Sequence, residues 1–148
     1  MQIHASCAAR DGAGVLLLGS PGSGKSDLLL RLLDLGFELV ADDRVEIDGR
    51  QARAPAALGG LLEVRGLGIV RLAHRGTASL VLAVQLLVAG DGGVADGATM
   101  RLPAPRRHPV LDLPLVTVDP AAVSAARRVS LALDCALGLV TQLAGAFA

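Results

Sequence analysis

The sequence predicts one α/β domain with a mixed β-sheet and a phosphate-binding loop. The chain has 148 residues, which is the length of a single domain with a sizeable core. Residues 19–26 match the whole Gly-x-x-x-x-Gly-Lys-Ser pattern of the Walker A motif, which binds phosphate groups between a strand and a helix. Several short apolar segments are separated by tight turns, so strands pair locally and the sheet is not purely parallel.

A strand, the phosphate-binding loop, a helix and a second strand are predicted in succession. Residues 14–18 form a short apolar run that is typical of a buried strand. Leucines recur with helical spacing over residues 25–35, and Gly36 provides the C-terminal stop. Residues 38–41 form the next strand, so the motif has the context that it requires. The first four residues lead directly into a further strand-like segment.

A β-hairpin and a less regular segment follow. Residues 45–47 and 51–54 are expected to pair across an Asp-Gly turn. Residues 55–60 then form a loop. Residues 61–72 mix apolar and charged side chains around two glycines, and part of this stretch is expected to be extended.

The second half of the chain is predicted to add more strands. Residues 80–88 have the length and β-branching of a buried strand. Residues 89–97 form a loop rich in Gly and Asp, and residues 98–102 form a short strand. Residues 103–109 form an extended surface loop, and residues 115–118 form the last strand.

One long helix is expected at the C-terminal end. Asp119 and Pro120 suit the N-cap and the first position of a helix. This helix is predicted to run to near the C-terminus, with Gly138 as the point where it can be interrupted.

Composition excludes several classes of protein. The formal net charge is zero and aromatic residues make up 1% of the chain, so neither a nucleic acid nor a membrane surface is an expected partner. No stretch reaches the roughly 18 uninterrupted apolar residues of a membrane span. The two cysteines, Cys7 and Cys135, are too few for a disulfide framework. With no signal peptide visible, a cytoplasmic location is expected. The high apolar content and the hydrophobic last helix predict a homo-oligomer.

The Walker A motif assigns a phosphate-binding role to a continuous run of residues. Its glycines let successive backbone N–H groups point at phosphate oxygens, and the following helix adds its positive N-terminal end. Lys25 is the only lysine of the chain, and a compact ammonium is what this position needs. The predicted nucleotide-binding residues are Gly19, Ser20, Pro21, Gly22, Ser23, Gly24, Lys25, Ser26 and Asp27.

Two further acidic sites lie after predicted strands. Asp42 and Asp43 follow the strand beside the loop, where one carboxylate could hold Mg²⁺ and the other accept a proton from a hydroxyl. The alternative is a turn or cap pair. Glu63 and Arg65 point to the same side of an extended segment, and could serve a metal and a phosphoryl group. Their alternative is an exposed strand with an ion pair.

Three blocks of the sequence together resemble the catalytic domain of the HPr kinase/phosphorylase family. They are residues 19–27, Leu-Val-Ala-Asp-Asp-Arg-Val-Glu-Ile at 39–47, and Leu-Glu-Val-Arg-Gly-Leu-Gly-Ile at 62–69. They occur in the family's order with similar spacing, and the third block is much more specific than the Walker A motif. The resemblance is clear over residues 4–71 and returns faintly in the last helix. It implies the fold of the HPr kinase C-terminal domain.

The resemblance also implies an activity and the residues that perform it. The family uses ATP and Mg²⁺ to phosphorylate a serine of HPr, a phosphocarrier of the sugar phosphotransferase system, and thereby regulates carbohydrate metabolism. Some members also remove that phosphate with inorganic phosphate. Asp43 matches the proton acceptor, Asp42 its neighbour, and His4 the histidine near the transferred phosphate. Lys25 and Ser26 match the ligands of phosphate and Mg²⁺.

Three later residues are assigned by the same resemblance. Glu63 matches a second metal ligand, and Arg65 lies in the block that both activities need. Arg127 matches an arginine near the last helix, because Asp134 then falls where the family has Glu. From spacing alone, a surface or partly buried histidine is the more frequent interpretation of His4, and a solvated basic face is that of Arg127 and its neighbour Arg128. The family's hexamers are the precedent for the expected oligomer.

The chain departs from the family pattern at several places. Pro21 stands where the family usually has Ser, and Ala-Ala-Arg-Arg at 125–128 replaces a Gly-Arg-Asn run. Residues 89–109 have little family character, and the family's C-terminal extension and additional N-terminal domain are not matched. In the family the late regions serve dephosphorylation and docking, so the kinase activity is implied more strongly than the phosphorylase activity. The alternatives are a kinase of a small hydroxyl compound and a nucleotide-sensing module without catalysis.

Overall fold

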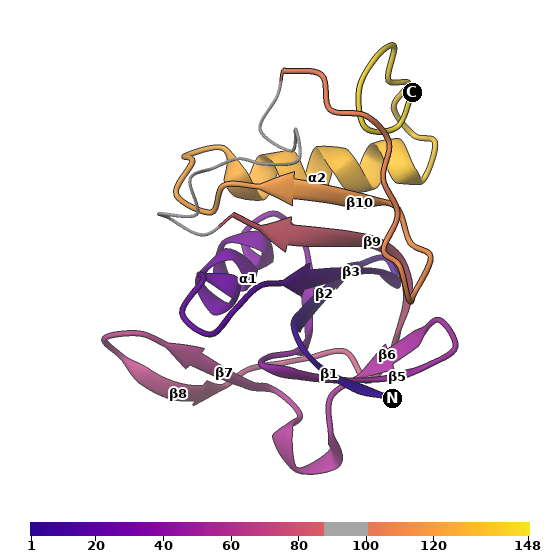
Figure 1. Ribbon diagram of the computed structural model, residues 1–148. Coiled ribbons are helices and arrows are strands. Elements are labelled where there is room, and N and C mark those ends of the chain that lie inside the picture. Colours follow the sequence, from indigo (N-terminus) through magenta and orange to yellow (C-terminus); the bar gives the residue numbers. More distant parts are fainter. Residues whose placement is uncertain (88–100) are drawn as a thin grey trace.

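Eight strands form one mixed sheet in the computed structural model, which describes residues 1–87 and 101–148 (Figure 1). Strand β9 is parallel to both β3 and β10, whereas the other pairs are antiparallel. The mixed α/β fold is therefore confirmed. The sheet order is β1 (Gln2–His4), β5 (Arg44–Asp48), β6 (Gln51–Arg53), β9 (Ala78–Leu86), β3 (Ala13–Leu18), β2 (Ser6–Arg10) and β4 (Glu38–Ala41), and β10 (Leu115–Val118) also pairs with β9.

Both helices cover the same face of this sheet. Helix α1 (Lys25–Leu33) and helix α2 (Ala125–Ala136) pack into one core cluster with Val15 and Leu17 of β3. Leu16, between them in sequence, belongs to a second cluster on the opposite face, because side chains alternate along a strand. Burial on both faces explains why β3 is apolar throughout.

A two-stranded hairpin projects beside the main sheet (Figure 1). It consists of β7 (Leu61–Val64) and β8 (Gly68–Arg71), which pair antiparallel. Leu62 is fully buried in the helix-side core and so fixes the base of the hairpin. The sequence predicts an extended segment here, and the pairing of its two halves is a finding of the structure.

The predicted start and length of the last helix are wrong. Helix α2 begins at Ala125 and ends at Ala136, and Gly138 has φ +75° just beyond its end. The Asp119 side chain does cap a backbone amide, since its Oδ1 accepts a hydrogen bond from the backbone N–H of Ala121 at 2.9 Å. It caps a turn instead of a helix, because the carbonyl of Pro120 is bound by Arg31 of α1 at 2.7 Å.

The other predicted elements agree with the structure to within a few residues where they are described. Residues 55–60 contain the short 3-10 helix η1 (Ala56–Leu58), and β1 was not predicted as a separate strand. The predicted loop at residues 89–97 lies outside the described residues. Of the strand expected at 98–102, only Arg101 and Leu102 are described, and they form a bend. No helix in the described part of the chain is long and apolar enough to cross a membrane.

Candidate active site

The Walker A residues form the loop that joins β3 to α1. Gly22 and Gly24 have φ of +80° and +101°, a region that favours glycine. A Cβ on Gly24 would also lie 3.4 Å from Pro120. Helix α1 starts directly at Lys25, with Gly24 at its N-cap. The loop therefore presents backbone amides and a helix N-terminus to one space, which is the geometry that binds phosphate.

The Lys25 side chain lies folded against this loop. Its Nζ donates to the carbonyl of Gly19 at 2.7 Å and to the carbonyl of Ser20 at 3.1 Å. The residue is only 8% exposed. The ammonium is thus held at the base of the loop by two neutral acceptors, and no carboxylate in the described residues pairs with it.

Asp42 connects three separate segments. Its Oδ1 accepts hydrogen bonds from the hydroxyl of Ser6 at 2.8 Å and from the hydroxyl of Ser26 at 2.7 Å. Its Oδ2 accepts one from the backbone N–H of Glu63 at 3.2 Å. A single carboxylate therefore aligns β2, the start of α1 and the β7–β8 hairpin around the phosphate-binding loop.

Asp43 faces the open side of the same region. It has φ +69°, and this left-handed conformation turns consecutive carboxylates in different directions. Its side chain is 69% exposed, and its Oδ1 lies 3.8 Å from Nδ1 of His4. His4 comes close because it pairs with Arg44 between β1 and β5. The two aspartates thus have distinct surroundings, one internal and one accessible.

These elements enclose a cavity of about 400 Å³, which lies within the usual range of ligand pockets. The end of β7 and the turn that follows it, at residues 63–65, form one wall, and the phosphate-binding loop and α1 form the other. The lining residues are Pro21, Gly22, Gly24, Lys25, Ser26, Asp27, Leu30, Asp43, Glu63, Val64 and Arg65.

Most residues singled out from the sequence are brought together here, and some are not. Gly19, Ser20 and Ser23 belong to the loop but do not line the cavity. Asp27 lines it and also pairs with Arg31 at 3.1 Å. Arg127 lies on the exposed side of α2 and does not line this cavity within the chain. Its assignment to the site stays a prediction.

Sequence reasoning missed Ser6 and the apolar wall of the cavity. Ser6 is fully buried and binds Asp42, and its Oγ lies 3.4 Å from the backbone N of Asp43. Leu30 and Val64 supply aliphatic surface. Leu30 follows from its position one turn after Ser26 in α1. Ser6 has no local signal, since only the pairing of β2 with β4 brings it beside the aspartates.

The donor set of the cavity suits Mg²⁺. Ser26, Asp43 and Glu63 bring a hydroxyl and two carboxylates to one space, and hard oxygen ligands are those that Mg²⁺ prefers. Asp42 reaches the same region through Ser26. Within the described residues, no group of three or more His, Cys, Asp or Glu side chains forms a closed metal cluster. This arrangement fits a Mg²⁺ that shares its ligands with a bound nucleotide.

Comparison with models of known protein families shows which family the chain belongs to. The family model described as the HPr Serine kinase C-terminal domain matches residues 1–95 of the 148. The chain belongs to this family. The match covers β1 to β9 and includes the whole cavity, and thus confirms the resemblance carried by the three sequence blocks.

Curated relatives extend the similarity to most of the chain. HPr kinase/phosphorylase of Cupriavidus metallidurans is 37% identical over 139 residues, which cover 85% of this chain and 41% of that protein. HPr kinase/phosphorylase of Burkholderia cenocepacia is 38% identical over 150 residues, which cover 90% of this chain and 44% of that protein. The chain thus spans less than half the length of these relatives. The structure of the Hpr(Ser) kinase/phosphatase from Coxiella burnetii matches with a TM-score of 0.76 at 23% identity, over 94% of this chain and 92% of that one, and shows the same fold.

Proposed function

We propose that this chain is an ATP-dependent protein serine kinase that acts on HPr in the cytoplasm. One observation carries the proposal: the Walker A loop, Asp43 and the Glu63–Arg65 segment line a single cavity. A phosphate-binding loop alone is compatible with a nucleotide sensor. An accessible carboxylate at the edge of that loop adds a group that can take a proton from an attacking hydroxyl.

Asp43 is the proposed proton acceptor. Its side chain is 69% exposed, so a hydroxyl presented by another protein can approach it. The attacking seryl oxygen forms a bond to the γ-phosphorus of ATP, the bond to the β–γ bridging oxygen breaks, and the seryl proton passes to the carboxylate of Asp43. His4, at 3.8 Å from Asp43, lies where it can contact the transferred phosphoryl group or the incoming serine.

The loop and the hairpin stabilise the charge of the transferring group. Lys25 exchanges its two backbone carbonyl partners for phosphate oxygens when ATP binds, and the loop amides bind the remaining oxygens. Arg65 supplies a second cation from the opposite wall. Ser26 and Glu63 would hold Mg²⁺, which would supply positive charge to the phosphate groups of ATP. Asp42 fixes Ser26 and the hairpin relative to each other, because its carboxylate accepts hydrogen bonds from the Ser26 hydroxyl and the Glu63 backbone N–H.

The acceptor protein is proposed from the family. The relatives from Cupriavidus metallidurans and Burkholderia cenocepacia are named HPr kinase/phosphorylase, so phosphorolytic removal of the phosphate is part of the proposal. A homo-oligomer, with a hexamer as the family precedent, is supported by apolar side chains left exposed after α2. Leu139 is 69% exposed and Leu143 is 93% exposed.

Mass spectrometry of HPr tests this function. The purified chain is incubated with ATP, Mg²⁺ and HPr of the same organism, and phosphate is added afterwards. We expect HPr to gain one phosphoryl group on serine and to lose it when phosphate is added. Asp43→Asn should abolish transfer and retain nucleotide binding, whereas Asp48→Asn, an exposed carboxyl at the end of β5, should change neither. Unmodified HPr despite intact nucleotide binding would contradict the proposal.

A further inference from the structure

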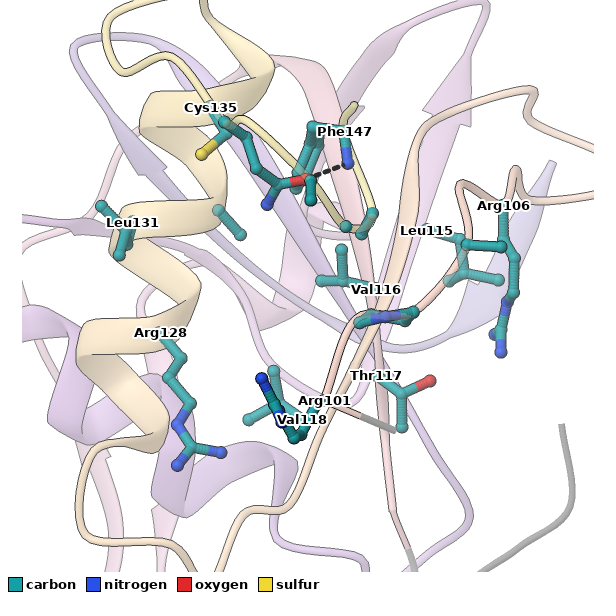
Figure 2. Close-up of a pocket in the computed structure, with 17 residues that line it drawn as sticks. Arg101, Arg106, Leu115, Val116, Thr117, Val118, Arg128, Leu131, Cys135 and Phe147 are labelled. Carbon is teal, nitrogen blue, oxygen red and sulfur yellow. Dashed lines mark hydrogen bonds between the residues drawn. The ribbon is translucent and has the colours of Figure 1, made fainter. Parts of the chain in front are cut away.

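A second cavity of about 380 Å³ lies at the opposite end of the domain from the β7–β8 hairpin. It is bounded by β10, α2, residues 101–106 and residues 142–147 (Figure 2). It shares no lining residue with the cavity at the phosphate-binding loop. None of the residues proposed for phosphoryl transfer reaches it, so it calls for a separate explanation.

The walls of this cavity are largely apolar. Val116 and Val118 of β10, Leu131 of α2 and Phe147 line it (Figure 2). The backbone N–H of Phe147 donates to Oε1 of Gln142 at 2.6 Å. This bond closes a turn over residues 142–147, and Phe147 within it packs against the helix-side core cluster and lines the cavity.

The charged residues of the lining all have one sign. They are Arg101, Arg106 and Arg128, and no carboxylate lines the cavity in the described residues. Arg101 and Arg128 lie toward one end of the cavity, and Cys135 and Phe147 lie toward the other (Figure 2). Arg101 and Arg128 therefore face the apolar surface across the cavity, while Arg106 lies to one side, beside Leu115 (Figure 2).

The Arg128 guanidinium is positioned to bind an anion. Its Nε donates to the hydroxyl of Ser124 at 2.8 Å, which fixes the side chain one turn back along α2. Within residues 1–87 and 101–148, its two terminal nitrogens make no hydrogen bond or ion pair. An oriented guanidinium with free donors is suited to a carboxylate, sulfonate or phosphate oxygen.

We propose that this cavity is a binding site for a small anionic ligand with an apolar body, such as an aryl or alkyl carboxylate, sulfonate or phosphate ester. The anionic group binds Arg101 and Arg128, and the apolar body packs against Val116, Leu131 and Phe147. The volume is within the range of about 300–1,000 Å³ that small-molecule sites occupy. The site is independent of the proposed kinase activity, and so its binding assay needs neither HPr nor phosphoryl transfer, with ATP used only as a competitor.

The probe is 8-anilinonaphthalene-1-sulfonate, which joins an aromatic body to one sulfonate. We expect one probe molecule per chain by fluorescence titration, with affinity that falls as salt is added. Arg128→Gln should weaken binding by about tenfold or more, because it removes a charge-assisted hydrogen bond. Arg127→Gln is the matched control, because Arg127 is adjacent on α2, exposed and outside the cavity lining. The Arg127→Gln protein should bind the probe with the same affinity as the unmodified chain.

Cys135 provides a second readout at the site itself. It lines the cavity and is partly exposed. Cys7 is fully buried, and burial raises its pKa to about 12, so neutral iodoacetamide should modify Cys135 alone in the folded protein. The probe should slow that modification with the same half-saturation as its fluorescence.

Three results would overturn the site. The first is equal probe affinity in Arg128→Gln and Arg127→Gln. The second is saturated fluorescence with no protection of Cys135. The third is displacement of the probe by ATP with Cys135 alkylation unchanged, which would place the probe at the phosphate-binding loop.

Discussion

At the scale of single residues, the carboxylate of Asp42 organises the candidate site. Three donors from different elements converge on it: the hydroxyls of Ser6 and Ser26 and the backbone N–H of Glu63. Ser6 is fully buried and its hydroxyl is also close to the amide of Asp43. We infer that Ser6 positions the two aspartates without touching the substrate.

Ser6→Ala should separate this positioning role from nucleotide binding. The loss of a hydrogen bond to a charged group is expected to lower stability by about 1.5–3 kcal/mol. It should also reduce kcat for HPr phosphorylation by about tenfold while KM for ATP changes little, because the phosphate-binding loop keeps its own contacts. Steady-state kinetics and urea unfolding measure the two effects.

A second buried serine provides the control. Ser130 of α2 is 7% exposed and accepts a hydrogen bond from Arg10 at 3.0 Å, outside the candidate site. Ser130→Ala should lower stability and leave kcat unchanged. If Ser6→Ala behaves in the same way, Ser6 has only a structural role.

The contrast between Lys25 and Ser6 shows what the sequence can predict about a site. The Walker A residues are recognisable because their spacing follows from one local structure, a strand, a loop and a helix. Ser6 lies in an apolar stretch that is typical of any buried strand. Its place beside Asp42 depends on the pairing of β2 with β4, which links residues that are distant in the sequence.

At the scale of elements, α1 and the turn before α2 hold each other in place. Arg31 Nη2 donates to the carbonyl of Pro120 at 2.7 Å, and its Nε pairs with Asp27 at 3.1 Å. Pro120 in turn lies against Gly24 of the phosphate-binding loop. The phosphate-binding loop therefore packs against the turn at Pro120, which is almost a hundred positions further along the chain.

Arg31→Gln should weaken this support. The glutamine is too short to keep both contacts, so stability should fall by about 1–3 kcal/mol and ATP affinity several-fold. Arg53→Gln is the matched control, since its ion pair with Glu46 is exposed and joins β5 to β6, away from the loop. Isothermal titration with an ATP analogue measures affinity. Unchanged affinity in Arg31→Gln would show that the turn does not support the loop.

The same turn explains the wrong prediction for the last helix. Asp119 followed by Pro120 is a strong local start signal, and Asp119 does bind a backbone amide. The contact with Arg31 fixes the carbonyl of Pro120 outside a helix, and α2 starts at Ala125. By contrast, α1 ends at Leu33, within two residues of the predicted end at residue 35, and Gly36 just beyond has the left-handed φ of +87° that a C-terminal stop requires.

At the scale of the whole molecule, one ion pair links the N-terminal sheet to the C-terminal helix. Arg10 at the end of β2 binds Asp134 of α2, and both side chains are about four-fifths buried, with exposures of 20% and 19%. The Arg10 guanidinium also lies 5.6 Å from the centre of the Phe37 ring. Residues 10 and 134 are near opposite ends of the chain, so this contact holds the C-terminal helix α2 against the N-terminal strand β2.

A double-mutant cycle should show that the pair acts as a unit. Asp134→Leu leaves the Arg10 charge partly buried without its partner, and Arg10→Met leaves the Asp134 charge in the same condition. Each should lower the free energy of unfolding by about 1.5–3 kcal/mol. The double variant should lose clearly less than the two changes added together, since apolar side chains of similar volume replace a desolvated pair without an orphaned charge. Urea unfolding of the four proteins gives the coupling energy. Strictly additive losses would mean that Arg10 and Asp134 stabilise the fold separately, Arg10 through Phe37 and Ser130, and that β2 and α2 are not joined by this contact.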